Sequence, residues 1–340
     1  MDHRLNLGLI GAGRIGTSHA QIIAERVPGA RLAAVADPRP GVADKLAQRY
    51  GAVGFSDPSA LITSPDVDAV VITASSDAHA GLIIAAAAAG KPIFCEKPAS
   101  MTLDEADQSL AAVEEAGVIL QVGFNRRFDT GFRAAYDAIA AGIIGNVQLM
   151  RSLTRDPVLA NPAGVPPWTI FLQTLIHDFD ALLWLNPGAE PVEVYATADA
   201  LVAPEFKDAG LLDTAVVVIT FDNGARAVAE ASFSAAYGYD VRGEVFGSAG
   251  MVAAGRNARN SLQLFTAAGA GFDTPRGDVE LMTDAYTAEF VEFAAAVREG
   301  RAPYVNGVDA RRALSVALAC IESVQRHAPA SVQTGTAVLT

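Results

Sequence analysis

Apolar residues in the first 123 positions come in short continuous runs, separated by segments whose apolar positions follow a helical period. The runs predict strands at Leu5–Ile10, Arg31–Ala36, Val53–Phe55, Ala69–Thr73, Pro92–Glu96 and Ile119–Gly123. The intervening segments predict helices at Ile15–Glu25, Val42–Arg49, His79–Ala89 and Leu103–Ala116. Continuous apolar strands that alternate with helices are typical of a parallel sheet covered on both faces. This half of the chain therefore predicts a doubly wound α/β domain.

The pattern changes after Asn125. A predicted helix, strand, Pro-rich loop and helix follow at Phe132–Ala141, Asn146–Arg155, Asp156–Pro167 and Trp168–Leu185. Strands then succeed one another at Val192–Ala198, Thr214–Phe221, Arg226–Phe233, Val241–Phe246 and Met251–Ala253, with a hairpin turn at Asn223-Gly224. Helices at Asp284–Glu299 and Val308–His327 close the chain. Strands without intervening helices predict an α+β domain with a large, mostly antiparallel open sheet. We expect domains at 1–125 and 126–340, with the option that the last helix packs back on the first domain.

Composition narrows the class of protein. A length of 340 residues favours two domains, and 51% hydrophobic residues are enough for large cores. The net charge of −13 argues against nucleic acid or anionic membranes as partners. The longest apolar stretch, Gly81 to Ala89, is far shorter than the roughly 20 residues of a membrane span. The start does not look like a signal peptide, and two cysteines imply no disulfide framework, so we expect a cytoplasmic protein.

A glycine pattern opens the first predicted helix. In "LGLIGAGRIGTSHA", Gly11, Gly13 and Gly16 form G-x-G-x-x-G directly after a strand. The first glycine allows a tight turn, the second admits a pyrophosphate close to the backbone, and the third lets helix and strand pack closely. The helix N-terminus favours the phosphates of a dinucleotide. This context predicts a Rossmann dinucleotide-binding domain, and the alternative is a glycine turn that holds no ligand.

Asp37 ends the second predicted strand, about 20 residues after the third glycine. A carboxylate there accepts hydrogen bonds from the ribose hydroxyls and repels a 2′-phosphate, which predicts NAD as the cofactor. The nearby Arg39 softens that preference, so NADP stays as the alternative. The alternative for Asp37 is an ordinary surface aspartate.

"FCEKPAS" places Glu96 and Lys97 where a parallel strand ends, the edge at which such sheets bind ligands. A lysine ammonium there is able to hydrogen-bond a substrate oxygen and stabilise alkoxide character during hydride transfer. Pro98 would hold the lysine in a rigid turn. The alternative is a surface lysine after a strand.

"FLQTLIHDFDALLWL" places ionisable groups in an apolar helix. Gln173 and His177 are four residues apart and so share one face, with Asp180 near it and Asp178 pointing away. We expect no metal, because no second His or Cys has ligand spacing with this pair. His177 is either a general acid/base facing a cofactor cleft or a structural core histidine.

Other polar and aromatic residues leave two interpretations open. Tyr237 and Tyr239 would face the same way if extended, and suit a sugar or cyclitol pocket or a core. Arg126 and Arg127 would bind an anionic group or pair with an acid such as Asp129.

Six stretches in this order, "GLIGAGRIGTSHA", "AVADP", "CEKPAS", "VGFNRRFD", "IHDFD" and "YGYDVRGEVFGSAGM", resemble the Gfo/Idh/MocA family of NAD(P)-dependent oxidoreductases. Within that family the chain is most similar to the inositol 2-dehydrogenase branch, and the resemblance runs from about Leu5 to Ser323. It implies a Rossmann domain, a C-terminal domain with a large open sheet, and dimers or tetramers formed through that sheet.

The resemblance also implies roles for individual residues. Lys97 matches the lysine beside the nicotinamide, and His177 matches the general acid/base. Pocket positions match Asn125, Arg126, Asp156, Gln173, Tyr237 and Tyr239. Cofactor positions match Gly11, Gly13, Arg14, Ile15, Gly16, Asp37, Arg39, Ser75, His79, Glu96 and Lys97.

The chain departs from the inositol dehydrogenase pattern at two places. Gln173 stands where an Asp is usual, four residues before the histidine, and "AAGAGFDTPRGD" replaces an aromatic-rich segment. We expect an NAD-dependent dehydrogenase of a ring hydroxyl in a cyclitol or sugar. The alternatives are a sugar or glycoside oxidoreductase that keeps its NAD tightly bound, and a non-catalytic NAD-binding regulatory protein.

Overall fold

The computed structural model describes residues 4–335, which divide into two compact units. The first unit comprises residues 4–125 and 284–314, and the second comprises 126–283 and 315–335. The division after Asn125 coincides with the change in sequence pattern. The second unit is not the continuous stretch 126–340, because residues 284–314 belong to the first unit.

The first unit is built on a six-stranded parallel sheet, which confirms the predicted doubly wound plan. Its strands are β1 (Leu5–Ile10), β2 (Ala30–Ala36), β3 (Val53–Phe55), β4 (Ala69–Ile72), β5 (Ile93–Cys95) and β6 (Leu120–Val122). Their order is β3-β2-β1-β4-β5-β6, and all pairings are parallel. The order reverses between β1 and β4, and that crevice is where doubly wound sheets bind ligands.

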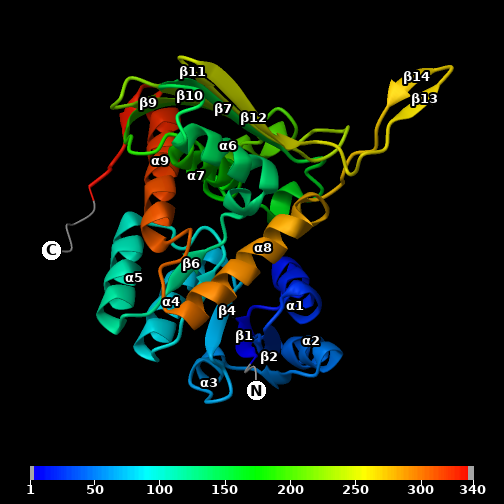
Figure 1. The fold of residues 1–340 in the computed structure, drawn as a ribbon, viewed down its shortest axis with the longest axis vertical. Helices are drawn as coiled ribbons and strands as arrows, with labels where there is room; N and C mark the ends of the chain where they lie inside the picture. Colours follow the sequence, from blue (N-terminus) through cyan, green and yellow to red (C-terminus); the bar gives the residue numbers. More distant parts are fainter. Residues whose placement is uncertain (1–3, 336–340) are drawn as a thin grey trace. The chain divides into compact units, whose positions relative to one another are not determined.

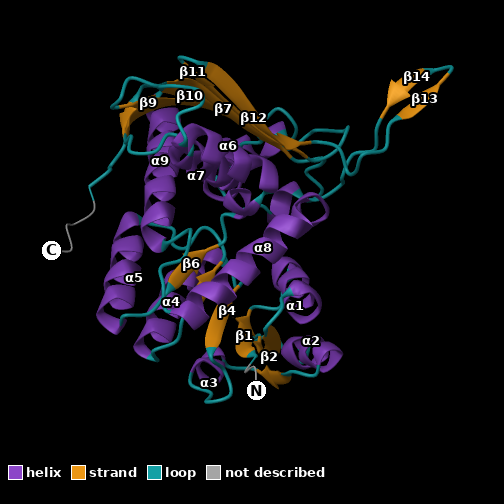
Figure 2. Cartoon of the chain, viewed as in Figure 1, coloured by secondary structure: helices purple, strands orange, loops and turns teal. Residues whose placement is uncertain are grey.

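Helices connect these strands, as the ribbon shows (Figures 1 and 2). They are α1 (Arg14–Arg26), α2 (Val42–Tyr50), α3 (Pro58–Ile62), the 3₁₀ turn η1 (Ser76–Ala78), α4 (His79–Ala88) and α5 (Leu103–Ala116). The sequence pattern did not indicate α3, although a start signal is present: Asp57 accepts a hydrogen bond from Ser59 N, and Pro58 takes the first helical position. A helix of five residues is too short to show apolar periodicity.

The second unit is built on a mixed, mostly antiparallel sheet of seven strands. They are β7 (Val147–Arg155), β8 (Pro191–Asp199), β9 (Thr214–Phe221), β10 (Arg226–Ser232), β11 (Asp240–Gly247), β12 (Gly250–Arg256) and β15 (Ala330–Ser331). The order is β12-β11-β7-β10-β9-β8-β15. Only β7 and β10 pair in parallel among these strands.

One face of this sheet is packed and the other is open. Helices α6 (Thr130–Ala140), α7 (Ile176–Trp184) and the end of α9 (Gly307–Arg326) lie near the packed face, as Figure 1 shows. The short helices η2 (Asn125–Phe128) and η4 (Ile170–Leu175) directly precede α6 and α7 in the chain. β9 alternates accordingly, with Val217 and Ile219 buried and Val216 and Val218 about 40% exposed. The 3₁₀ turns η3 (Pro162–Gly164) and η5 (Pro204–Ala209) lie in connections.

A small hairpin of β13 (Leu264–Thr266) and β14 (Gly269–Gly271) was not predicted. It lies at the end of two long connections, away from the seven-stranded sheet (Figure 1). Its residues are exposed, which explains why they carry no core pattern. It leads into α8 (Asp278–Glu299), which begins six residues before its predicted start. Among residues 4–335, no helix is both long enough and apolar enough to span a bilayer.

Candidate active site

The glycine loop between β1 and α1 has the geometry of a phosphate cradle. Gly11 has φ +100°, and a Cβ on Gly16 would lie 1.9 Å from the Gly11 carbonyl oxygen, so both positions need glycine. A Cβ on Gly13 would meet nothing within 4 Å, so the backbone there is open on that side. Gly13 also begins α1 without a side-chain cap. The start of α1, with Arg14 and Ile15 in its first turn, therefore offers an uncapped N-terminus to an anion.

Asp37 lies at the end of β2 and is buried. Its Oδ2 accepts a hydrogen bond from Ala12 N at 2.8 Å, which ties it to the glycine loop. Arg39 donates to the same carboxylate through Nε at 2.8 Å, NH2 at 2.7 Å and its backbone N at 3.0 Å. These bonds, the Arg39 side chain first, lower the pKa of Asp37 to about 2. A carboxylate has about four acceptor sites, and the N–H of Ala12 with the three donors of Arg39 occupies them.

Ser75 and His79 follow β4. Ser75 begins η1. The His79 ring is buried, with Nδ1 2.8 Å from the Pro98 carbonyl oxygen and Nε2 3.1 Å from that of Ala74. Burial lowers the pKa of His79 and favours the neutral ring. His79 therefore links the segments that follow β4 and β5, and its ring faces protein backbone.

Glu96 and Lys97 follow β5 directly. Glu96 is buried: its Oε1 lies 2.6 Å from His19 Nε2, and its Oε2 accepts the backbone N–H of Lys97 at 3.1 Å. Burial opposes ionisation of Glu96, but the hydrogen bond and charge of His19, with Lys97, lower its pKa overall. The carboxylate thus fixes the main chain at Lys97, which lies at the carboxyl edge of the parallel sheet.

The predicted helix around His177 is two kinds of helix in sequence. η4 is a π-helix and contains Gln173, and α7 is an α-helix that begins just before His177. Gln173 and His177 are half-buried, whereas the residues between them are buried, so both face the less covered side. The prediction of a single α-helix over Trp168–Leu185 was therefore wrong for Ile170–Leu175, which form a π-helix. π-Turns occur frequently at functional sites.

Arg126 and Asp178 form a buried ion pair in the second unit. NH1 and NH2 of Arg126 donate to the two oxygens of Asp178 at 2.6 and 3.1 Å. Ser152 and Thr154 of β7 donate to the same carboxylate and accept from Arg126. Asp178 was expected to point away from the functional face, and it lies against the sheet. With Arg126 2% exposed, its guanidinium is used inside the unit, which differs from the open pocket wall expected for it.

Arg127 forms a second buried pair, with Asp180. Its Nε and NH2 donate to the carboxylate at 2.9 and 2.5 Å. Asp129, the acid expected to pair with one of these arginines, instead caps α6 by accepting from Gly131 N and Phe132 N. Asn125 precedes the two arginines in η2 and is buried. The "NRRFD" segment thus fastens η2 to α7 and starts α6.

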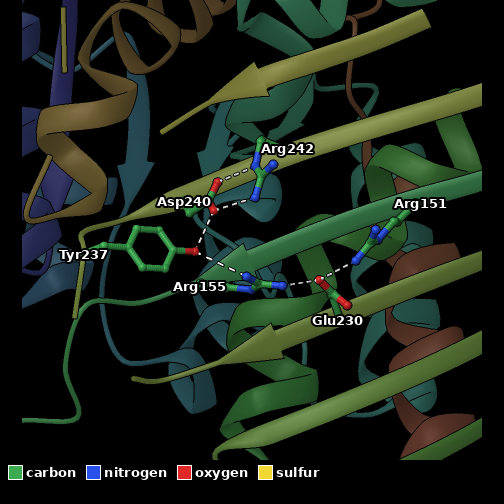
Figure 3. A network of polar contacts seen from close by, with 6 residues as sticks. All are labelled: Arg151, Arg155, Glu230, Tyr237, Asp240 and Arg242. Atoms are coloured by element: carbon green, nitrogen blue, oxygen red, sulfur yellow. Dashed lines mark hydrogen bonds and ion pairs between the residues drawn. The ribbon is translucent and has the colours of Figure 1, made fainter. Parts of the chain in front are cut away.

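Tyr237 and Tyr239 do not face the same way, because Gly238 between them has φ +132° and breaks the extended run. The Tyr237 hydroxyl donates to Asp240 at 2.7 Å and belongs to a charged network (Figure 3). That network also contains Arg151, Arg155, Glu230 and Arg242. Burial raises the pKa of Tyr239 well above its usual value, and Asp156 raises it further.

The negative charges of Asp278 and Asp178 also raise the pKa of Tyr239, and the positive charge of Arg126 lowers it. Asp156 follows β7 and is fastened by its backbone to Ser232 and Ala235. Tyr237 lies beside Arg155, the residue before Asp156, because Arg155 NH1 donates to its hydroxyl at 3.4 Å. His177 lies on α7, the helix that carries Asp178, and Gln173 lies on η4 directly before it.

Two buried residues carry no role in the sequence interpretation. His19 of α1 and Glu289 of α8 lie with Glu96, and ligand atoms of the three residues are all within 4.8 Å of one another. His19 lies three residues after Gly16, and Glu289 lies in an apolar helix pattern. An ionisable residue in an apolar helix pattern was the sequence signal for a buried polar cluster. The signal did not identify the partners, because only folding brings α1 and α8 to the end of β5.

Family models match most of the chain. Residues 5–124 match the model described as "Oxidoreductase family, NAD-binding Rossmann fold". Residues 132–253 match the model described as "GFO/IDH/MocA C-terminal domain".

Relatives match along nearly their whole length. The chain is 39% identical to inositol 2-dehydrogenase of Rhizobium meliloti, over 96% of this chain and 99% of that protein. It is 36% identical to scyllo-inositol 2-dehydrogenase (NAD(+)) of Bacillus subtilis, over 97% and 96% of the two chains. Among solved structures, myo-inositol dehydrogenase of Lactobacillus casei in complex with NAD(H) and myo-inositol superposes with a TM-score of 0.90. That match has 26% identity and covers 99% of each chain.

Proposed function

Because the chain belongs to the Gfo/Idh/MocA family of oxidoreductases, we propose that it is an NAD-dependent dehydrogenase of a cyclitol or sugar. The reaction is oxidation of a secondary ring hydroxyl to a ketone. The observation that carries the proposal is the glycine loop: Gly13 is open, α1 has an uncapped N-terminus, and Asp37 is bonded to the same loop. Relatives named as inositol dehydrogenases supply the substrate class.

Residues of the first unit would hold the cofactor. The start of α1 would bind the pyrophosphate, and Asp37 would accept the ribose hydroxyls once Arg39 has moved aside. When bound, NAD accepts a hydride from the substrate carbon. The buried carboxylate of Asp37 would repel a 2′-phosphate, and this favours NAD over NADP.

Lys97 and His177 are the proposed catalytic residues. His177 takes the proton of the reacting hydroxyl, because an imidazole titrates near neutral pH. The Lys97 ammonium stabilises the negative charge that develops on the same oxygen. Glu96 supports this role by holding the backbone N–H of Lys97.

The substrate contacts proposed for the second unit are Gln173, Asp156 and Tyr239. Gln173 offers one acceptor and two donors but no charge. An Asp at this position would stabilise the imidazolium of His177. With Gln173 we expect a less basic His177 and a different preference for hydroxyl configuration.

The open face of the seven-stranded sheet is the proposed contact between copies of the chain. It exposes large apolar side chains on several strands: Leu149, Tyr195, Val216, Val218, Phe246 and Met251. The charged network of Figure 3 lies on the same face. Isolated apolar side chains are ordinary on surfaces, but a set on one sheet face indicates an interface. We propose a dimer or tetramer.

A substrate screen tests the proposal. Purified protein is incubated with cyclitols, aldoses and glycosides, each with NAD and with NADP, and reduced nicotinamide is measured. We expect turnover of at least one cyclitol or aldose with NAD, and loss of about a thousandfold or more in kcat for Lys97→Ala and His177→Asn, on the scale of removed electrostatic and acid/base groups. NAD binding without turnover across the panel would favour a regulatory protein. Nicotinamide retained through purification would favour the glycoside alternative.

A further inference from the structure

Three ionisable side chains meet in the interior of the first unit. His19 comes from α1, Glu96 from the end of β5 and Glu289 from α8, and their exposed fractions are 0%, 5% and 0%. Their ligand atoms all lie within 4.8 Å of one another. Of the three, only Glu96 lies next to a proposed catalytic residue.

Glu96 occupies the middle of this cluster. One of its oxygens bonds His19 at 2.6 Å, and the other accepts the backbone N–H of Lys97 at 3.1 Å. Among residues 4–335, neither oxygen of Glu289 has a hydrogen-bond partner, nor has Nδ1 of His19. Any change in the direction of the Glu96 carboxylate is therefore transmitted to the main chain at Lys97.

The surroundings of the cluster are apolar. The rings of Phe290, Tyr286 and Phe94 lie around His19, with centroid distances of 4.9, 5.2 and 6.1 Å. An isolated charge in such surroundings is strongly disfavoured. The cluster holds two carboxyl groups and only one side chain able to carry a positive charge, so ionisation of both carboxyl groups would leave at least one uncompensated negative charge.

A proton on Glu289 resolves this imbalance. Burial raises the pKa of Glu289 well above its usual value, and the negative charge of Glu96 adds to the effect. The charged or titratable groups that act on the cluster or pack against it are His19 from α1, Cys95, Glu96 and Lys97 from β5 and its end, His79 from α4, and Tyr286 from α8. Two carboxylates that share one cation commonly have pKa values driven apart in this way.

We propose that Glu289 is protonated at neutral pH and that His19 and Glu289 are positioning residues, which hold Glu96 in the orientation that fixes the backbone of Lys97. The proposal rests on the proposed function only in the role of Lys97. When Glu289 loses its proton, its carboxylate competes with Glu96 for His19. Glu96 then turns, and Lys97 loses its fixed position.

A metal ion is the competing explanation, because one His and two Glu form a donor set that zinc accepts. The geometry disfavours it. Two ligands of a tetrahedral zinc, with bonds of about 2.0–2.1 Å, lie roughly 3.3 Å apart. The His19–Glu96 separation is 2.6 Å, which is a hydrogen-bond distance.

Thermal unfolding of Glu289→Gln as a function of pH tests the protonated state without any substrate. Glutamine has the shape of a protonated glutamate and cannot ionise. In the wild type, the unfolded carboxyl ionises near its ordinary pKa of 4.5, while the folded one stays protonated to higher pH. Stability of the wild type therefore falls relative to Glu289→Gln as pH rises above about 4.5, so the Tm difference widens in favour of the variant.

The matched control is Glu299→Gln, on the same helix but with an exposed side chain. The Tm of Glu299→Gln should not increase relative to that of the wild type as the pH rises. A Glu289→Gln difference that stays constant between pH 5 and pH 8 would overturn the proposal. So would one equivalent of divalent metal per chain in elemental analysis of the purified protein.

The pH profile of kcat tests the positioning role. On the alkaline side, kcat of the wild type should fall at a lower pH than kcat of Glu289→Gln. KM for NAD should agree within about twofold between the two proteins. Coinciding alkaline limbs would overturn the link from Glu289 to Lys97. If neither protein turns over any polyol, the proposed function fails, and the Tm measurement still decides the protonation of Glu289.

Discussion

Arg126 in the second unit and Glu289 in the first are both fully buried ionisable side chains, but their charges are balanced in different ways. Arg126 is always a cation and meets one carboxylate, Asp178, through two hydrogen bonds. Glu289 lies with one histidine and a second carboxylate, and its oxygens bond no described residue. The first arrangement is neutral at any ordinary pH, whereas the second is neutral only when it holds the right number of protons. The contribution of the buried charges to stability should therefore change little with pH at Arg126 and Asp178, and change with pH at the cluster of Glu289.

The largest effect should come from Asp178→Leu. This change leaves the Arg126 guanidinium buried without its counter-ion, which typically destabilises a protein by about 3–5 kcal/mol. Urea unfolding measures the loss. The double variant Arg126→Met/Asp178→Leu should recover most of it, since a buried pair replaced by apolar groups is often neutral. A double variant as unstable as the single one would contradict this account of the pair.

Asp37 shows a third way to balance a buried charge, because its buried carboxylate pairs with the exposed guanidinium of Arg39. Its pKa of about 2, against an ordinary 3.8, means that its stabilisation is present above about pH 4 and is lost as pH falls toward 2. Arg39 is exposed, so solvent screening limits the effect to about 1–2 kcal/mol. Asp37→Asn should lower the unfolding free energy by that amount at pH 7 and by much less near pH 2.

Asp37→Asn should also raise KM for NAD about tenfold or more and narrow the gap between NAD and NADP, because the charge that repels a 2′-phosphate is gone. Initial rates with both cofactors check this result. A variant with an unchanged ratio of the two KM values would show that another group selects the cofactor.

Glu289→Leu is the direct counterpart of Asp178→Leu, since both replace a buried acid with an apolar side chain. Here the remaining His19–Glu96 pair is neutral by itself, so we expect a change of no more than about 1.5 kcal/mol at pH 7. Equal losses for the two leucine variants in the same urea experiment would remove the distinction between the two arrangements.

The smallest effect should come from Arg39→Ala. The guanidinium is 60% exposed, so water and salt screen its ion pair with Asp37 and the free energy of unfolding should change little. The change frees acceptor positions on Asp37, so KM for NAD should fall or stay within about twofold. A rise of tenfold would show that Arg39 itself contacts the cofactor.

The sequence pattern predicted all six strands of the parallel sheet and six of the seven strands of the other, and it missed β15, which has only two residues. The bounds of β9 and α5 agree with the predicted bounds to the residue. Short or exposed elements carried no such signal, which is why α3 and the hairpin of β13 and β14 were not predicted.

The glycine loop was predictable because Gly11 and Gly16 are required by the local backbone geometry and the three glycines keep a fixed spacing after a strand. The partners of Arg126 and Arg127 were not, since Asp178 and Asp180 lie about 50 residues further along the chain and only folding brings them to η2. Tyr237 and Tyr239 would face the same way only in an extended segment. Gly238 between them has φ +132°, a backbone conformation that the alternation of residues does not reveal.

The junction of η4 and α7 lets the position of Gln173 change independently of the position of His177. Gln173 lies in the π-helical part and His177 in the α-helical part. Deleting one residue upstream of Leu175 would rotate the π-helical residues before the deletion around the helix axis, while α7 and its bonds to η2 stay in register. The substrate contact proposed for Gln173 can therefore move by one position along η4 while His177 keeps its place on α7.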